Sequence, residues 1–257
     1  MNIRISPRRA GRLLCFVVAS LAAASVAGQV ARYTINHGAY KWYTGLFDVD
    51  REQNIPSWWQ GTCILICAVL LSVIALHKRR VRDRFRWSWT GLAAIFFVLA
   101  IDEMCSLHEQ LGKLLSSRGV QLHGAFEYQW VVPGMAIVLV VGLMYVRFLL
   151  NLPRRYGARF AIAGAIYVCG AIGVEMISAW YAARFGDNNL PFQLIATLEE
   201  IMEMSGMSLF LVTLVSYASQ IVPPVTVHFD SETEPQRSGD GVVEVEAQRR
   251  QRDRFAA

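Results

Sequence analysis

The stretch AIDEMCSLHEQ (residues 100–110) follows the apolar run GLAAIFFVL (residues 91–99) without a turn signal between them. A run of this kind predicts a membrane-crossing helix, with Asp102, Glu103, His108 and Glu109 in its second half. Ionisable side chains in such a helix cost about 2.5–3.5 kcal/mol each on insertion scales. We therefore expect these four residues to serve a specific purpose in the protein.

The other apolar residues also fall in blocks of about twenty, the length that crosses a hydrocarbon core of roughly 30 Å. Only 18% of the residues are charged, whereas soluble domains carry about 25%. The sequence thus predicts an all-α, polytopic transmembrane helical bundle with spans at about residues 13–30, 60–76, 88–111, 127–150, 160–182 and 192–222. These spans form one domain, residues 1–222, and residues 223–257 are expected to be a polar, disordered cytoplasmic tail.

Positive charges indicate how the helices cross the membrane. The loop HKRRVRDRFR (residues 77–86) holds six Lys and Arg residues and one acid, and further arginines stand in residues 4–12 and 154–159. Cation-rich loops stay in the cytoplasm, so six spans with both termini inside the cytoplasmic (inner) membrane account for every cation-rich segment. Because the cations stand at the ends of apolar blocks, they do not predict a surface for nucleic acid.

The first apolar run leaves two interpretations open. Residues 13–30 follow an arginine-rich start, and Ser25-Val26-Ala27 resembles the small-residue site at which a signal peptide is cleaved. The same run is long enough to be a first transmembrane helix, which its length favours. Both interpretations place the next residues outside the cytoplasm.

A second acidic stretch, LEEIMEMSG (residues 198–206), lies in the last apolar block, and Glu175 lies in the block before it. At 1.5 Å per residue, Asp102 and Glu175 stand roughly 21 and 22 Å from the inner ends of their helices. Glu199 and Glu203 stand roughly 10 and 16 Å from the outer end of theirs, so all four share the outer half of the membrane. The helix at residues 88–111 carries polar residues on most sides, so we expect it in the centre of the bundle.

Crowded carboxylates in a dry layer need protons or a bound cation. Carboxylates and imidazole on facing helices are also the ligands of di-metal sites, although the Glu-x-x-His spacing of those sites is absent. The sequence therefore predicts a site for a divalent metal ion of unknown identity. Its expected ligands are Asp102, His108, Glu109, Glu175, Glu199 and Glu203, with Glu103, Ser106 and Glu200 around them.

The patterns Asp-Glu-x4-His-Glu and Glu-Glu-x2-Glu-Met-x-Gly, with the external segment at residues 47–56, resemble a family of uncharacterised bacterial multi-pass membrane proteins. The resemblance covers about residues 45–222. It implies that the acids and the histidine belong to the family's pattern, and it implies no particular activity.

Three functions fit these observations. The first is a metal-dependent intramembrane enzyme whose partners are the lipid bilayer and a lipid-type substrate. The second is a proton- or cation-coupled transporter or channel for an ion or small molecule, although the inner half of the predicted spans lacks ionisable residues to continue a path. The third is a non-catalytic membrane scaffold or sensor whose polar cluster fixes helix packing. The first is preferred.

Overall fold

The computed structural model describes residues 6–35 and 41–222, and all its regular elements within these ranges are helices. Six helical segments are long and apolar enough to cross a membrane. They are α1 (Pro7–Thr34), α3 (Ile55–Arg80), α4 (Arg86–Cys105), α6 (Val131–Asn151), the continuous segment Arg154–Phe185, and α9 (Leu190–Ile221). The predicted all-α class with six apolar helices is therefore confirmed. The predicted tail, residues 223–257, lies outside the described residues.

Three shorter helices connect these segments: α2 (Lys41–Phe47), α5 (Leu107–Ser117) and the 3-10 turn η1 (Gly124–Phe126). The segment Arg154–Phe185 is itself composite. It consists of α7 (Arg154–Val168), a π-helical turn η2 (Cys169–Val174) and α8 (Glu175–Phe185). A π-helical turn inside a transmembrane helix is uncommon and often marks a functional site.

Helix α9 is the centre of the described bundle. It contacts α1, α3, α7, η2 and α8, and more than half of its apolar window is buried. Gln29 of α1 is fully buried and donates a hydrogen bond to Gln193 of α9 over 2.9 Å, which ties the first helix to the last. The expectation that residues 88–111 would occupy the centre is wrong, because α4 packs mainly on α3 and only 22% of its apolar window is buried, against 56% for α9.

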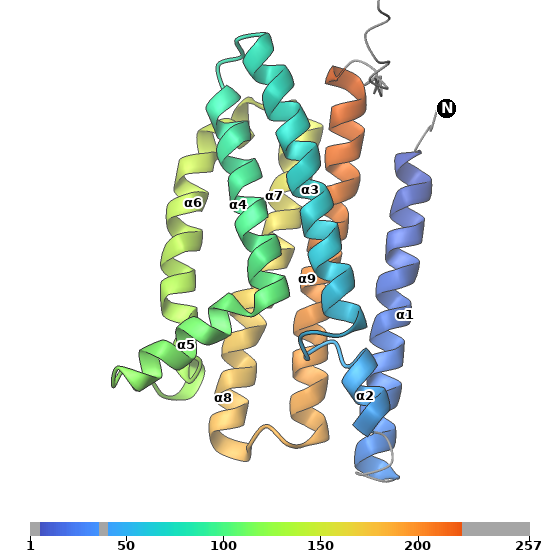
Figure 1. Cartoon of the computed structure of the whole chain (residues 1–257), viewed down its shortest axis with the longest axis vertical. Coiled ribbons are helices and arrows are strands. Elements are labelled where there is room, and N and C mark those ends of the chain that lie inside the picture. Colours follow the sequence, from blue (N-terminus) through green and yellow to red (C-terminus); the bar gives the residue numbers. More distant parts are fainter. Residues whose placement is uncertain (1–5, 36–40, 223–257) are drawn as a thin grey trace, which may run out of the picture. The chain divides into compact units, whose positions relative to one another are not determined.

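The two ends of the bundle differ in charge. The start of α1, the α3–α4 turn, the α6–α7 turn and the end of α9 lie together at one end (Figure 1), which we call the arginine-rich end. In the half next to this end, aromatic side chains fill the core. Trp89 stacks on Tyr217 with ring centroids 5.1 Å apart, and Phe96 stacks on Phe210 at 4.5 Å. We call the opposite end the acidic end.

The helix expected at residues 88–111 is two helices. Helix α4 ends at Cys105, and Ser106 adopts a left-handed conformation with φ 53° and ψ 44°. The Asp102 carboxylate accepts a hydrogen bond of 2.8 Å from the backbone N–H of His108 and so satisfies a donor that the start of α5 would leave unpaired. Helix α5 then leaves the α4 axis (Figure 1), so Asp102 and Glu109 do not lie on one continuous helix.

Two glycines set the distance between α9 and the neighbouring segment. A methyl group on Gly206 would lie 2.7 Å from the Tyr167 nitrogen and 2.8 Å from the Ala163 oxygen, both backbone atoms. A methyl group on Gly170 would lie 2.9 Å from the Glu199 backbone oxygen. Small residues at such positions let helices approach closely in a membrane.

We expect Gly206→Ala to destabilise the protein by about 1–3 kcal/mol, because backbone atoms of α7 must move to admit the methyl group. Gly164→Ala is the matched control, since Gly164 is also inside a helix but faces open space. Its substitution should be neutral or stabilising through helix propensity. Melting temperatures of the two variants in detergent test this difference, and equal melting temperatures would contradict the close approach.

Candidate functional site

The carboxyl groups of Glu175 and Glu199 meet where α8 packs on α9. Their side chains lie within hydrogen-bonding reach of each other, and Ser178 Oγ donates to Glu199 Oε2 over 3.4 Å. Trp130 Nε1 donates to Glu175 Oε1 over 3.1 Å. Two ionised carboxylates have no donor to share, so this contact requires a proton on one of them or a cation between them.

The π-helical turn places this pair. It puts Gly170 directly against the Glu199 backbone, and it ends one residue before Glu175, the first residue of α8. Without the extra residue of the wider turn, Glu175 would be rotated away from its present direction. The departure from regular α-helix therefore coincides with the meeting of the two acids.

A second group of acids gathers around Glu203, one turn further along α9. The Glu203 carboxylate hydrogen-bonds with the Tyr167 hydroxyl. Glu103 of α4 and Glu200 of α9 lie within electrostatic reach of it. Only 8% of the surface of Glu203 is exposed. Three carboxyl groups and a phenol from α4, α7 and α9 thus lie within electrostatic reach of one another.

A third group is built on the helix break at Ser106. His108 Nδ1 lies 3.2 Å from Asp102 Oδ2, and His108 Nε2 lies 3.9 Å from Glu52 Oε1. Burial by itself lowers the pKa of His108, but the hydrogen bond to Asp102 and the charges of Asp102 and Glu52 raise it to about 9. Its imidazole therefore carries a positive charge at neutral pH.

Residues between α2 and α3 also belong to the site. Burial raises the pKa of Glu52 to about 7, and its Oε2 is buried without a hydrogen-bond partner among the described residues. Asp50 lies within electrostatic reach of Glu175 and Glu109. The sequence predicts a segment outside the membrane here and does not indicate that it joins the site. The sequence feature that could have indicated its role is the high density of acids in FDVDREQ (residues 47–53).

The structure divides the predicted site residues among three groups and leaves some of them outside the groups. The structure brings Glu175 to Glu199, Glu103 and Glu200 to Glu203, and Asp102 to His108. Glu109 is different, because it is exposed on α5 and forms an ion pair of 2.7 Å with Lys113. Ser106 acts through its backbone, as the residue at which the helix turns.

Within residues 6–35 and 41–222, no group of three or more His, Cys, Asp or Glu side chains is arranged to hold a metal ion. The carboxyl groups come in pairs and small groups rather than around one point. The metal site therefore stays a prediction, and any cation would require side-chain rotations to collect its ligands.

A family model for a domain of unknown function (DUF8692) matches residues 10–218. The chain belongs to this family. All three groups of acids lie within the matched range, and thus within the DUF8692 domain. The match confirms the expectation that the family has no assigned activity. No curated protein and no solved structure matches the chain significantly.

The raised pKa of His108 predicts a pH-dependent contribution to stability. The pKa of His108 is about 9 in the folded protein and about 6.5 in the unfolded chain, so its charged form favours folding. This stabilisation is complete below pH 6.5 and is lost as the pH rises through about 9. The difference in unfolding free energy between wild type and His108→Gln should fall by up to about 3 kcal/mol between pH 6 and pH 9.5. Melting temperatures in detergent across this range measure it, and a difference that does not change with pH would disprove the charged pairing.

Proposed function

We propose that this DUF8692 protein is an enzyme of the cytoplasmic membrane that acts on a lipid-type substrate from the outer side, with a divalent cation bound among its carboxylates. One observation carries the proposal: the acids gather in the half of the bundle next to the acidic end, while aromatic side chains close the other half. Orientation follows from the arginine-rich end, which faces the cytoplasm by the positive-inside rule.

The closed inner half favours an enzyme over a transporter. Trp89, Leu214, Leu71 and Ile74 are fully buried there, and the described parts of the helices around them carry no acid until the acidic end is reached. A transported ion or proton needs polar groups along its whole path. A substrate that enters and leaves from the outer leaflet needs polar groups only in the outer half of the bundle.

The site offers the groups that acid–base chemistry requires. When a proton lies between Glu175 and Glu199, one carboxyl group can donate it and the ionised partner can accept one, as in other carboxylate pairs that share a proton. The positive charge of His108, fixed by Asp102, can stabilise negative charge that develops on a substrate oxygen. Glu203, hydrogen-bonded to Tyr167, is positioned as a second base.

A divalent cation would balance the excess of negative charge and polarise a carbonyl or phosphoryl oxygen of the substrate. Its proposed ligands are the five predicted carboxylates (Asp102, Glu109, Glu175, Glu199 and Glu203) or a subset of them, collected after side-chain rotation. His108 could join them only after it loses its proton, because a charged imidazole has no lone pair for a metal. Glu103 and Glu200, which lie beside Glu203, would support it or join it.

The catalytic part of the proposal is tested with purified protein in nanodiscs made from a total bacterial lipid extract. Mass spectrometry of the lipids should show a species consumed by wild type and consumed at least about 100-fold more slowly by Glu203→Gln, because a lost acid or base typically costs 10²–10⁴ in rate. Asp83→Asn is the control, since Asp83 pairs with Lys78 at the arginine-rich end. A wild-type protein that consumes no lipid would refute an enzyme of this class.

The cation is tested separately by elemental analysis of the same preparations. We expect about one divalent ion per wild-type chain and less than a tenth of that in Glu203→Gln. Wild-type protein without a stoichiometric metal would remove the cation from the proposal and leave acid–base chemistry by the carboxyl groups alone.

A further inference from the structure

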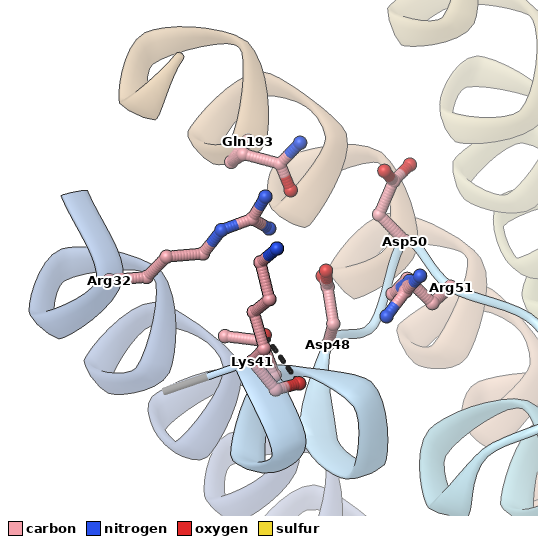
Figure 2. A pocket seen from close by; sticks show the side chains of 7 residues that line it. Arg32, Lys41, Asp48, Asp50, Arg51 and Gln193 are labelled. Carbon is pink, nitrogen blue, oxygen red and sulfur yellow. Dashed lines mark hydrogen bonds between the residues drawn. The ribbon is translucent and has the colours of Figure 1, made fainter. Parts of the chain in front are cut away.

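A polar pocket of about 410 Å³ lies near the acidic end, beside the carboxyl groups described above. The end of α1, α2, the segment after α2 and the first turn of α9 surround it (Figure 2). Its lining combines three cations, two carboxylates and an amide: Arg32, Lys41, Arg51, Asp48, Asp50 and Gln193. With Thr44, these residues make a lining that has no apolar side chain in the part of the chain that the structure describes, so a ligand here would be held by charge and hydrogen bonds.

The charges around this pocket do not neutralise one another by contact. Among the described residues, none of the three cations forms an ion pair within 4.0 Å with a carboxylate. Figure 2 shows the Arg32 and Lys41 side chains extending toward the same space, with Asp48 and Asp50 across from them. Opposite charges that stand around a cavity without touching are suited to a ligand that carries both charges.

Two unsatisfied atoms point to the same ligand. Asp48 is only 2% exposed. Gln29 lies within hydrogen-bonding reach of its carboxylate, but Asp48 Oδ1 has no hydrogen-bond partner within the described parts of the chain. Arg32 Nε, on the other side of the pocket, is likewise buried and unpaired there. An unpaired buried polar atom costs about 1–3 kcal/mol. The acceptor on Asp48 needs a donor and the donor on Arg32 needs an acceptor, and a zwitterion supplies both.

The surroundings of the pocket resemble a membrane–water interface. Trp42 of α2 and Trp58 near the start of α3 are each 68% exposed, and Ile35 at the end of α1 is 72% exposed. Exposed tryptophans of this kind lie at the level of the lipid head groups. A ligand in the pocket would therefore sit at head-group depth.

We propose that this pocket binds a phosphoethanolamine group. The phosphate accepts hydrogen bonds from Arg32 and Lys41, because guanidinium and ammonium groups are the usual phosphate donors. The primary ammonium donates to Asp48 and Asp50. The group can come from a phospholipid head group or from a soluble phosphoethanolamine.

This binding does not depend on the proposed enzymatic function. It would support that function, however, because Asp50 joins the pocket to the acids: it lines the pocket and lies within electrostatic reach of Glu175 and Glu109. A bound head group would then sit next to the carboxyl groups. Loss of binding and loss of catalysis are measured in different experiments and are separable.

The test measures binding with wild-type protein and three variants. In the first assay, the melting temperature in detergent is measured at increasing concentrations of O-phosphoethanolamine, inorganic phosphate, ethanolamine or serine. In the second assay, native mass spectrometry compares how much phosphatidylethanolamine, phosphatidylglycerol and phosphatidylcholine the protein retains. The variants are Arg32→Gln, Asp48→Asn and Lys41→Gln. Lys41 is exposed, so its substitution leaves the fold intact. Arg118→Gln, an exposed arginine at the end of α5, is the control.

We expect a phosphoethanolamine compound to raise the wild-type melting temperature by several degrees or to be retained selectively, with affinity at least tenfold lower in the three variants and unchanged in Arg118→Gln. A response to the lipid alone identifies a membrane lipid as the source, and a response to the soluble compound identifies the free group. The proposal is overturned if neither form binds, if inorganic phosphate or serine binds equally well, or if the variants keep wild-type affinity.

Discussion

Crowded carboxyl groups in an apolar bundle are the constraint on which the rest of this structure depends. Glu175 and Glu199 lie within hydrogen-bonding reach, and Glu103, Glu200 and Glu203 form a second group within electrostatic reach of one another. The imidazole beside them belongs to His108, which is already paired with Asp102. Like charges at such distances keep their places only when protons or an external cation compensate them. The fold therefore needs bound protons or a cation among these acids to be stable.

The chain leaves regular α-helix where this constraint acts. The left-handed Ser106 ends α4 directly beside Asp102 and Glu103, and the π-helical turn η2 ends directly before Glu175. Gly170, inside that turn, brings the backbone of α9 close enough for the acids to meet. Backbone departures of this kind are stable only when their surroundings hold them, and they concentrate at functional sites. Helix α9 provides those surroundings because it contacts most of the other long helices.

The sequence predicted the six apolar helices because each block has the length that a membrane requires. Depth along the helices also placed Glu175 and Glu199 in one layer, where the structure brings them together. It could not predict the break at Ser106, since no glycine or proline marks it and the capping contact with His108 appears only in three dimensions. Asp50 and Glu52 were missed because a loop between spans is normally solvated, whereas this one folds back onto the site.

The central claim is that the acids are open to one side of the membrane and closed to the other. The most direct measurement starts from a variant without the native cysteines, into which Glu175→Cys or Thr213→Cys is introduced. Each variant is reconstituted into oriented proteoliposomes, and a small membrane-impermeant thiol reagent is added to one side at a time. Thr213 is 1% exposed, on the arginine-rich side of the acids along α9. We predict that the cysteine at 175 reacts only from the acidic end and that the cysteine at 213 reacts from neither side. Reaction of either cysteine from the arginine-rich end, or protection of position 175 from both sides, would contradict the account.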